Sequence, residues 1–486
     1  MSHNHAAAPT YTGESAETQL AFAGLGGQAQ LLADGVVSSR DLVELALQRI
    51  EEAQPRLNAF RVICVETALA AAGDADRRLA AGESAPLLGV PVAIKDDVDL
   101  AGETTPFGCG GAHTPATKDA ELVRRLRAAG AIVIGKTQAP EVGQWHFTES
   151  PAFGATRNPW NTDHTPGGSS GGAAAAVAAG LVAAAIGSDG AGSVRIPAAW
   201  TGLVGLKPQR GRISTWPDAE AFNGLACFGP LTRSIADAAL LLDVVAGSRE
   251  GDLHRPAPHS ESYALAASRP PRRLRIALSF ATPIGVPGAV DPEIRAAIEL
   301  TATRLTDLGH EVIRTDPSYG LVGASIVPRG MAGVRSWIDE RVPEPGALEA
   351  RTRVHARCGR VLSGPALRAA RAIEPALARR IGRVFERVDV VLTPTTAKPA
   401  PRIGALQGRG YWATSTTASA ICPYAWAWNV IGWPALSVPA GFTEQRLPIG
   451  AQLLGRENDE ATLLALGAEL EAAEDGEWMK LRPAQS

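Results

Sequence analysis

The sequence predicts an α/β fold in which a large mixed, mainly parallel β-sheet is covered by helices on both faces. Short apolar runs with the character of buried strands alternate with longer runs of helical spacing, and this strand–helix–strand alternation is typical of such sheets. The 486 residues, 45% of them apolar and 20% charged, have the composition of an ordinary globular protein. We expect a loose N-terminal tail over residues 1–15 and one large domain over residues 16–486.

The first long helix is predicted by its cap and its periodicity. Apolar residues recur at helical spacing between Gln28 and Ile50. Within this stretch, Ser38 followed by Asp41 resembles the box that begins a helix, because each side chain can accept a free backbone N–H of the first turn. We therefore expect helical structure from Gln28 to Ile50.

A strand–helix–strand unit follows. Residues 90–94 form a short apolar run that ends at Lys95 and predicts a buried strand, and residues 131–134 predict the next strand. Between them, residues 119–129 have the spacing of an amphipathic helix that Gly130 ends. Lys95 stands out because only six of the 47 basic residues are lysines.

Residues 173–185 are rich in alanine and carry no charge. A membrane helix needs about 20 strongly apolar residues, and this stretch is shorter and poor in Leu, Ile and Phe. We therefore expect a buried core helix that its neighbours can approach closely.

Further along the chain, we expect a helix at 240–245, a surface connection at 250–273, strands at 275–278, 390–392 and 436–438, and a more helical, variable section at 290–388.

Charge and cysteine content narrow the class of protein. The formal net charge of −3 gives no electrostatic reason to expect nucleic acid or an anionic membrane as a partner. The five cysteines form no CxxC pair, so neither a disulfide framework nor a cysteine-rich zinc site is expected. The nine histidines lack metal-ligand spacing, and we expect no metal and no cofactor. The N-terminus has no secretory signal, which predicts a cytoplasmic location.

Two clusters of glycine and serine are the strongest candidates for a site. They span residues 165–172 (TPGGSSGG) and residues 187–193 (GSDGAGS). Such loops expose successive backbone N–H groups, which bind anions such as the oxyanion of an acyl-transfer reaction. A phosphate loop is disfavoured because the Gly-Lys-Ser/Thr ending is missing. Taken alone, each cluster is more often a tight turn than a site.

Together with Lys95, these clusters resemble the amidase signature family, the Ser–Ser–Lys hydrolases. Ser193 lies 24 positions after Ser169, and Lys95 lies 74 positions before Ser169. The resemblance extends over most of the chain. Segments similar to the family occur at residues 90–96, 135–137, 154–160, 166–172, 187–197, 205–208, 211–212, 392–394, 429–439 and 447–452.

The resemblance implies a role for each residue of this set. Ser193 matches the nucleophile, Ser169 matches a bridging serine held by a non-proline cis peptide, and Lys95 matches the base. A hydroxyl attacks only when a neighbour takes its proton, and a lysine takes it only if burial lowers its pKa from about 10.4. Ser169 would then relay a proton between Ser193 and Lys95 and later return it to the leaving amine.

The resemblance also places an oxyanion hole at the backbone N–H groups of Gly190, Ala191, Gly192 and Ser193. Most members have glycine where this chain has Ala191, whose Cβ would be strained at a positive φ. We expect an altered pocket there rather than lost activity. Gln138 and Trp200 also depart from the residues that are common at their positions, which puts the choice of substrate in doubt.

Two further groups of residues follow from the resemblance. Those expected to hold the nucleophile loop are Ser188, Asp189 and Arg195. Gly143 and Gln144 align with a stretch that lines the acyl pocket, and together with Ser169 they are the expected substrate-binding residues.

Several residues near these motifs have alternative interpretations. Asp96 and Asp97 can pair with a cation or cap a turn. His146 and His164 are expected at the surface or at the pocket rim, rather than in a Ser–His–Asp triad. Cys109 could be a thiol nucleophile, but no neighbour is evident that would lower its pKa.

The aromatic side chains of residues 424–433 have two interpretations that we weigh equally. They either pack in the core or form an apolar wall for an aryl or alkyl substrate. Residues 290–388 are expected to form part of the substrate mouth.

The sequence therefore predicts an amidase that hydrolyses C–N bonds of small aryl or alkyl amides through an acyl-enzyme on Ser193. Esters and carbamates (urethanes) present the same carbonyl group and are expected to be cleaved too. The alternative is a glutaminase-type subunit of a tRNA-dependent amidotransferase complex, although no glutamine-recognition segment is evident. A non-catalytic scaffold would have no use for Lys95, Ser169 and Ser193 together. Assembly into a homodimer is left open.

Overall fold

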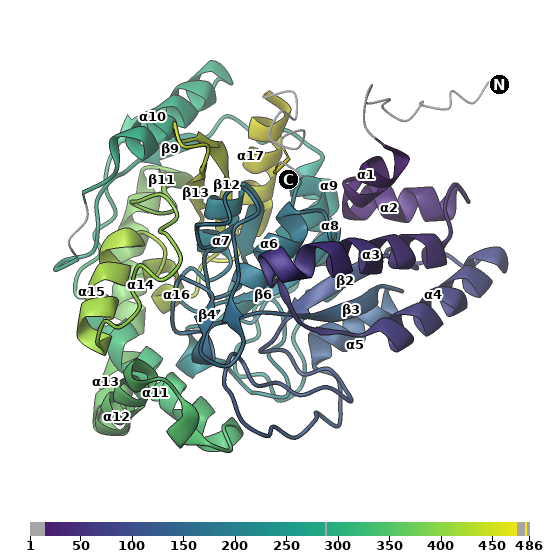
Figure 1. Ribbon diagram of the computed structural model, residues 1–486. Helices are drawn as coiled ribbons and strands as arrows, with labels where there is room; N and C mark the ends of the chain where they lie inside the picture. Colours follow the sequence, from purple (N-terminus) through teal and green to yellow (C-terminus); the bar gives the residue numbers. More distant parts are fainter. Residues whose placement is uncertain (1–14, 287–288, 474–481, 484–486) are drawn as a thin grey trace.

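A computed structural model describes residues 15–286, 289–473 and 482–483. An 11-stranded sheet runs through the molecule (Figure 1). In sheet order its strands are β1 (Phe60–Ile63), β3 (Ile132–Thr137), β2 (Pro91–Lys95), β6 (Ala184–Asp189), β8 (Cys227–Thr232), β7 (Val204–Lys207), β12 (Ala435–Phe442), β13 (Pro448–Leu454), β11 (Val390–Pro394), β9 (Arg275–Leu278) and β10 (Glu311–Arg314). A separate hairpin pairs β4 (Glu149–Ser150) with β5 (Gly154–Ala155). The expected tail lies outside the described residues except for Ser15, which caps the first helix.

The helices, in chain order, surround this sheet. They are α1 (Ala16–Ala21), α2 (Gly24–Ala33), α3 (Ser39–Leu57), α4 (Val65–Ala80), α5 (Glu121–Ala128), α6 (Gly171–Ala178), α7 (Arg195–Thr201), α8 (Ile235–Val245), α9 (Tyr263–Ala267), α10 (Pro292–Asp307), α11 (Gly323–Arg341), α12 (Ala350–Leu362), α13 (Pro365–Ala372), α14 (Glu374–Gly382), α15 (Tyr411–Ile421), α16 (Ala427–Ile431) and α17 (Glu460–Ala473). Short 3-10 turns are η1 (Glu141–Gly143), η2 (Phe222–Gly224), η3 (Pro345–Ala347) and η4 (Arg383–Glu386). No helix in the described ranges is long and apolar enough to cross a membrane.

The sheet is mixed, as the sequence predicts, but the expected excess of parallel pairs is not found among the described strands, where six of the ten pairs are antiparallel. Among the ten pairs of neighbouring strands in the described chain, four are parallel, and they lie toward the two edges as β3–β2–β6 and β11–β9–β10. The pairs between β6 and β11, and the edge pair β1–β3, are antiparallel. Parallel pairing therefore dominates the flanks and not the centre, where a short connection such as that between β12 and β13 joins strands without a crossover helix.

Both faces of the sheet are covered by helices. Successive side chains of a strand point to opposite faces. In β2, Val92 and Ile94 pack into one apolar cluster with α5, α8 and α17, whereas Ala93 packs into another with α3, α4 and α6. The alternation confirms the predicted arrangement of a sheet between two layers of helices.

The helical stretch expected from Gln28 to Ile50 is interrupted and forms two helices, α2 and α3. The interruption lies at Gly35, whose φ of 67° ends the first helix. The predicted box then begins the second: Ser38 Oγ accepts the Asp41 N–H at 3.0 Å, and the Asp41 carboxylate accepts the Ser38 N–H at 3.2 Å.

The alanine-rich helix is shorter than expected. α6 ends at Ala178, and Gly180 turns the chain with a φ of 64°. Residues 184–189, which the sequence assigned in part to the helix, form strand β6 instead. Alanine fits both structures, so composition alone did not locate this boundary. The other predicted elements are present within a few residues of their expected limits, at β2, α5, β3, α8, β9, β11 and β12.

The parallel pair β2–β6 positions the site. Parallel strands end at the same edge of a sheet, and ligands bind outside those carboxyl ends. Lys95 is the last residue of β2, and Asp189 is the last residue of the adjacent β6. The two strand ends therefore place the predicted lysine next to the predicted nucleophile loop.

Candidate active site

Lys95 is fully buried at the end of β2. Its Nζ donates hydrogen bonds to Ser169 Oγ and to Ser188 Oγ, both at 2.7 Å. Asp97 Oδ2 lies 3.6 Å from the same nitrogen and accepts a short hydrogen bond from the Ser188 hydroxyl. The ring of Phe107 lies against the ammonium group, 5.0 Å from Nζ to the ring centroid. The lysine is thus enclosed and held by three polar partners.

Burial lowers the pKa of Lys95, and the nearby carboxylates of Asp97, Asp189 and Asp96 oppose this shift without cancelling it. An ammonium group that has lost its water is disfavoured relative to the neutral amine. A neutral amine can accept a proton, so the environment provides what a lysine base requires.

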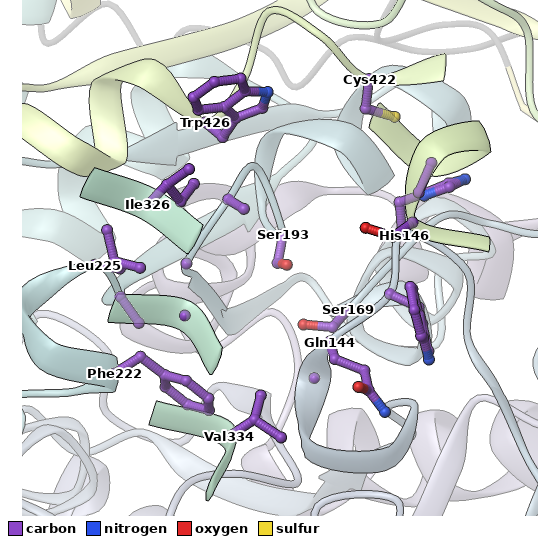
Figure 2. Close-up of a pocket in the computed structure, with 18 of the residues that line it drawn as sticks. Gln144, His146, Ser169, Ser193, Phe222, Leu225, Ile326, Val334, Cys422 and Trp426 are labelled. Atoms are coloured by element: carbon purple, nitrogen blue, oxygen red, sulfur yellow. The ribbon is translucent and has the colours of Figure 1, made fainter. Parts of the chain in front are cut away.

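Ser169 and Ser193 open into one cavity. The Gly168–Ser169 peptide bond is cis, as the family resemblance implies, and Ser169 lies two residues before the start of α6. Ser193 lies in the turn between β6 and α7. Figure 2 shows the two hydroxyl groups facing the same space. In the described chain, the hydrogen bonds run from Lys95 to Ser169, and the Ser193 hydroxyl faces the cavity without a bond to Ser169.

Asp189 holds the nucleophile loop in shape. Its buried carboxylate accepts the backbone N–H groups of Gly192 at 2.8 Å, Val194 at 3.1 Å and Arg195 at 3.4 Å. Burial by itself raises the pKa of this carboxyl group, but the Arg195 guanidinium and the Asn429 amide outweigh burial and hold the pKa below its usual range. A permanently ionised Asp189 therefore organises the turn that carries Ser193.

Arg195 completes this buried network. It forms a two-point ion pair with Asp189, at 3.0 Å from Nε and 2.9 Å from Nη2. Its remaining donors reach Ala425 O at 2.8 Å, Gln452 Oε1 at 2.7 Å and Asn429 Oδ1 at 2.7 Å. Because these three partners lie more than 200 positions further along the chain, Arg195 links the loop to the C-terminal part of the molecule.

The nucleophile loop offers fewer free oxyanion donors than the sequence predicts. The Gly192 N–H already donates to Asp189, so Gly190, Ala191 and Ser193 are the stronger candidates for the oxyanion hole. Gly192 has a φ of 110°, and a Cβ there would lie 2.5 Å from the Ala425 side chain, so this position needs glycine for packing. Ala191 does not have a positive φ, and its Cβ therefore brings no backbone strain.

The cavity has a volume of about 360 Å³ and two unlike sides. Figure 2 shows an apolar wall on one side of the serines, formed by Phe222, Leu225, Ile326, Val334 and Trp426. Gln144, His146 and Cys422 lie on the other side. Ile326 and Val334 belong to α11, so the helical section 290–388 does contribute to the cavity, as expected.

None of the described residues that line the cavity carries a charge at neutral pH. Burial lowers the pKa of both lining histidines, His146 and His355, to about 4. Of the aromatic group 424–433, Trp426 faces the cavity, whereas Trp428 is fully buried in the core. Each of the two interpretations of that group is therefore right for part of it.

The predicted substrate-binding residues Gly143 and Gln144 do line the cavity. Gly143 has a φ of 60°, and a Cβ there would lie 2.3 Å from the Phe107 ring and 3.0 Å from Ser169 Oγ. The Gln144 side chain is bound by α12: its amide nitrogen donates to Thr352 Oγ1, and its oxygen bonds His355 Nδ1 at 2.7 Å. No sequence pattern indicates these partners, because they lie 208 and 211 positions away.

The alternatives left open around the signature are now resolved. Asp96 pairs with two cations, Arg61 at 2.7 Å and Lys136 at 3.3 Å. His164 is buried, with its Nδ1 2.7 Å from the Ala400 oxygen, so its expected surface or rim position is wrong. Cys109 is fully buried, and burial raises the pKa of its thiol to about 12, which disfavours the nucleophilic thiolate.

Comparison of the sequence with known proteins points to the same class of enzyme as this site geometry. The family model described as Amidase matches residues 41–464. A protein of Mycobacterium tuberculosis named "Putative amidase AmiA2" is 53% identical over 454 residues, which cover 93% of each chain. A glutamyl-tRNA(Gln) amidotransferase chain of a Synechococcus species is 36% identical over 479 residues, covering 92% of this chain and 95% of its own.

The solved structures that are similar to this chain are also amide hydrolases. A 6-aminohexanoate cyclic dimer hydrolase superposes with a TM-score of 0.88 at 33% identity and covers 95% of this chain and 99% of its own. A bacterial aryl acylamidase of the amidase signature family superposes with a TM-score of 0.83 at 26% identity, covering 95% and 98%. The match extends over both serine clusters and Lys95, and the chain belongs to the amidase signature family of hydrolases, which cleave amide C–N bonds.

Proposed function

We propose that the protein hydrolyses small, uncharged aryl or alkyl amides through an acyl-enzyme on Ser193. The observation that carries the proposal is the 2.7 Å hydrogen bond between buried Lys95 and Ser169, at the base of the cavity that Ser193 enters. A base with a lowered pKa, a hydroxyl relay and an accessible second hydroxyl are the parts that nucleophilic acyl transfer needs.

In this mechanism neutral Lys95 takes the proton of Ser169 while Ser169 takes the proton of Ser193. The Ser193 oxygen then bonds to the substrate carbonyl carbon, and the resulting oxyanion is bound by loop N–H groups. Lys95 returns its proton through Ser169 to the departing amine, which leaves the acyl group on Ser193. Water, deprotonated by the same route, releases the acid and restores the serine, so one amide and one water give one acid and one amine.

The lining of the cavity supports the substrate class. An apolar wall favours an aryl or alkyl group, and a cavity without charged side chains among its described residues disfavours carboxylate and ammonium groups, which lose their water on entry. Esters and carbamates have the same carbonyl geometry at the attacked carbon. We therefore include ester and carbamate cleavage in the proposal.

The amidotransferase alternative is less well supported. Glutamine carries an ammonium and a carboxylate group at its α-carbon, and a site for it needs charged partners to replace the lost water. The described residues that line this cavity supply none. A chain that acts alone on neutral amides fits the cavity better.

The test compares purified protein with Ser193→Ala on nitroanilides, short aliphatic amides, nitrophenyl esters, aryl carbamates and glutamine. We expect turnover of anilides and esters, and a loss of at least about 10³-fold in kcat/KM in the variant. Ser84→Ala, at an exposed serine, is the matched control and should retain full activity. Activity that survives in Ser193→Ala would move the nucleophile elsewhere, and turnover of glutamine alone would favour the amidotransferase class.

A further inference from the structure

Four polar side chains connect the cavity loop at η1 to helix α12. The Glu141 carboxylate accepts the Glu349 N–H at 3.1 and 3.2 Å, and the Thr352 hydroxyl beside it opposes the rise of its pKa that burial causes. Gln144 Nε2 donates to Thr352 Oγ1, and Gln144 Oε1 bonds His355 Nδ1 at 2.7 Å. The chain of contacts runs from a buried carboxylate to a histidine that lines the cavity.

The chemistry of each group fixes the direction of these hydrogen bonds. The Gln144 amide nitrogen has only donor sites, so the Thr352 hydroxyl accepts from it, and above the raised pKa of Glu141 of about 7 the same hydroxyl can donate only toward the ionised carboxylate. The Gln144 oxygen then accepts, so His355 Nδ1 carries the proton. His355 has a lowered pKa of about 4 because it is buried, so the ring is neutral and its second nitrogen, Nε2, has a free lone pair.

His355 Nε2 is available to a ligand. In the part of the chain that the structure describes, this nitrogen has no hydrogen-bond partner and is not sealed from solvent, in contrast to His146 Nε2, which is buried without a partner. The Tyr411 ring lies 4.9 Å from the His355 ring and limits its rotation. His355 Nδ1 is bonded to Gln144, which Figure 2 shows on the side of the serines away from Leu225 and Ile326.

We propose that His355 Nε2 accepts a hydrogen bond from an N–H or O–H group of the substrate and thereby selects amides that carry a neutral donor toward the Gln144 side of the cavity. The inference rests on the proposed function, because it concerns the same cavity. His355 would contact the substrate directly, whereas Gln144, Thr352 and Glu141 act as positioning residues that fix its tautomer. A substrate with an apolar group at one end and a hydroxyl or amide N–H at the other satisfies both sides.

The test uses pairs of neutral anilides of equal size, in which a hydroxymethyl group on one substrate replaces an ethyl group on the other. The group is placed at the meta or para position of the acyl ring or of the anilide ring, and kcat/KM is measured at pH 8, where Glu141, with a raised pKa of about 7, is ionised. One neutral hydrogen bond corresponds to a preference of up to roughly tenfold. We expect that preference for the hydroxymethyl member in at least one pair.

His355→Phe keeps a ring of similar size and removes the acceptor, so the preference should fall to about one. His355→Gln, whose carbonyl oxygen can occupy the place of Nε2, should retain part of it. Thr352→Val removes the hydroxyl group near Glu141 with little change of size. The Gln144 amide can then flip so that its nitrogen faces His355, the proton on Nδ1 is no longer favoured, and the preference should fall. His259→Phe, outside the cavity lining, is the matched control.

Within each variant, the ratio of kcat/KM between the two members of a substrate pair does not depend on how much of the protein is folded. Equal turnover of both members of every pair by the wild-type protein would overturn the inference, and so would an unchanged preference in His355→Phe. Failure of the proposed function looks different, because the wild-type protein would then turn over no member of any pair.

Discussion

Lys95 shows how one residue acquires a property that its type does not have in water. The protein removes the water around the ammonium group and then places Asp97 3.6 Å away, so burial and a neighbouring charge act in opposite directions on the same pKa. Burial is the stronger of the two. The working range of the enzyme therefore depends on the balance between these two effects, and that balance can be changed at Asp97.

Asp97→Asn should move the acidic limb of the pH profile of kcat/KM to lower pH. In the proposed mechanism neutral Lys95 is the active form, so activity should rise with pH through the pKa of Lys95. Loss of the carboxylate removes an interaction that favours the ammonium form, and the pKa falls further. Steady-state kinetics between pH 5 and 10 measure the position of the limb. Asp74→Asn, at an exposed ion pair, is the control; a limb that stays in place in Asp97→Asn contradicts the prediction.

Helix α6 shows how small residues position a catalytic group at the scale of an element. All of its residues are buried, and it begins two positions after Ser169. A Cβ on Gly172 would lie 2.4 Å from the Gln138 backbone nitrogen and 2.5 Å from the Ala59 oxygen. The helix therefore packs against backbone that cannot move aside, and this contact sets the depth of Ser169 in the site.

Gly172→Ala should destabilise the protein by about 1–3 kcal/mol, because overpacking forces the helix away from its neighbours. We also expect a loss of activity, since the displaced helix carries Ser169 with it. Urea denaturation and anilide turnover measure the two effects. Gly346→Ala, at a glycine with nothing within 4 Å of the added Cβ, should change neither. Equal urea midpoints for the two variants would show that the α6 contact is not tight.

The whole molecule combines a cavity whose described lining carries no charged side chain with a buried lysine beside it. In the described ranges, no group of three or more His, Cys, Asp and Glu side chains is arranged to hold a metal. The hydrogen-bonded set of Lys95, Ser169 and Ser188 already supplies a proton acceptor at the base of the cavity. In the proposed mechanism it is this lysine that activates the nucleophile.

Exhaustive dialysis against EDTA should leave kcat/KM for anilides unchanged. The comparison is with a sample dialysed against buffer alone and with samples to which Zn²⁺ or Mg²⁺ has been restored. Activity that falls on chelation and returns with a metal would require a metal site and would overturn the assignment of Lys95 as the sole activating group.

The sequence by itself determined the features that depend on local pattern. A short apolar run predicts strand β2, and the Ser38–Asp41 box predicts the start of α3. The spacing of the two serine clusters and Lys95, which the family shares, predicts that they form one site. These features need only neighbouring residues or a fixed motif. The boundary between α6 and β6 does not follow from local pattern. Alanine is compatible with both a helix and a strand, so the alanine-rich sequence does not show where α6 ends and β6 begins.

Tertiary structure decided what lies around the catalytic groups. Gly192 has the right position for an oxyanion donor, but the fold brings the Asp189 carboxylate to its N–H. His355 lies 211 positions from Gln144, and no local pattern connects the two residues. Hydrogen bonds and cavity walls depend on distances in space, and chain folding brings together segments whose separation in sequence carries no information about contact. The reaction class could therefore be predicted from the sequence, whereas the selectivity of the cavity could only be inferred from the folded structure.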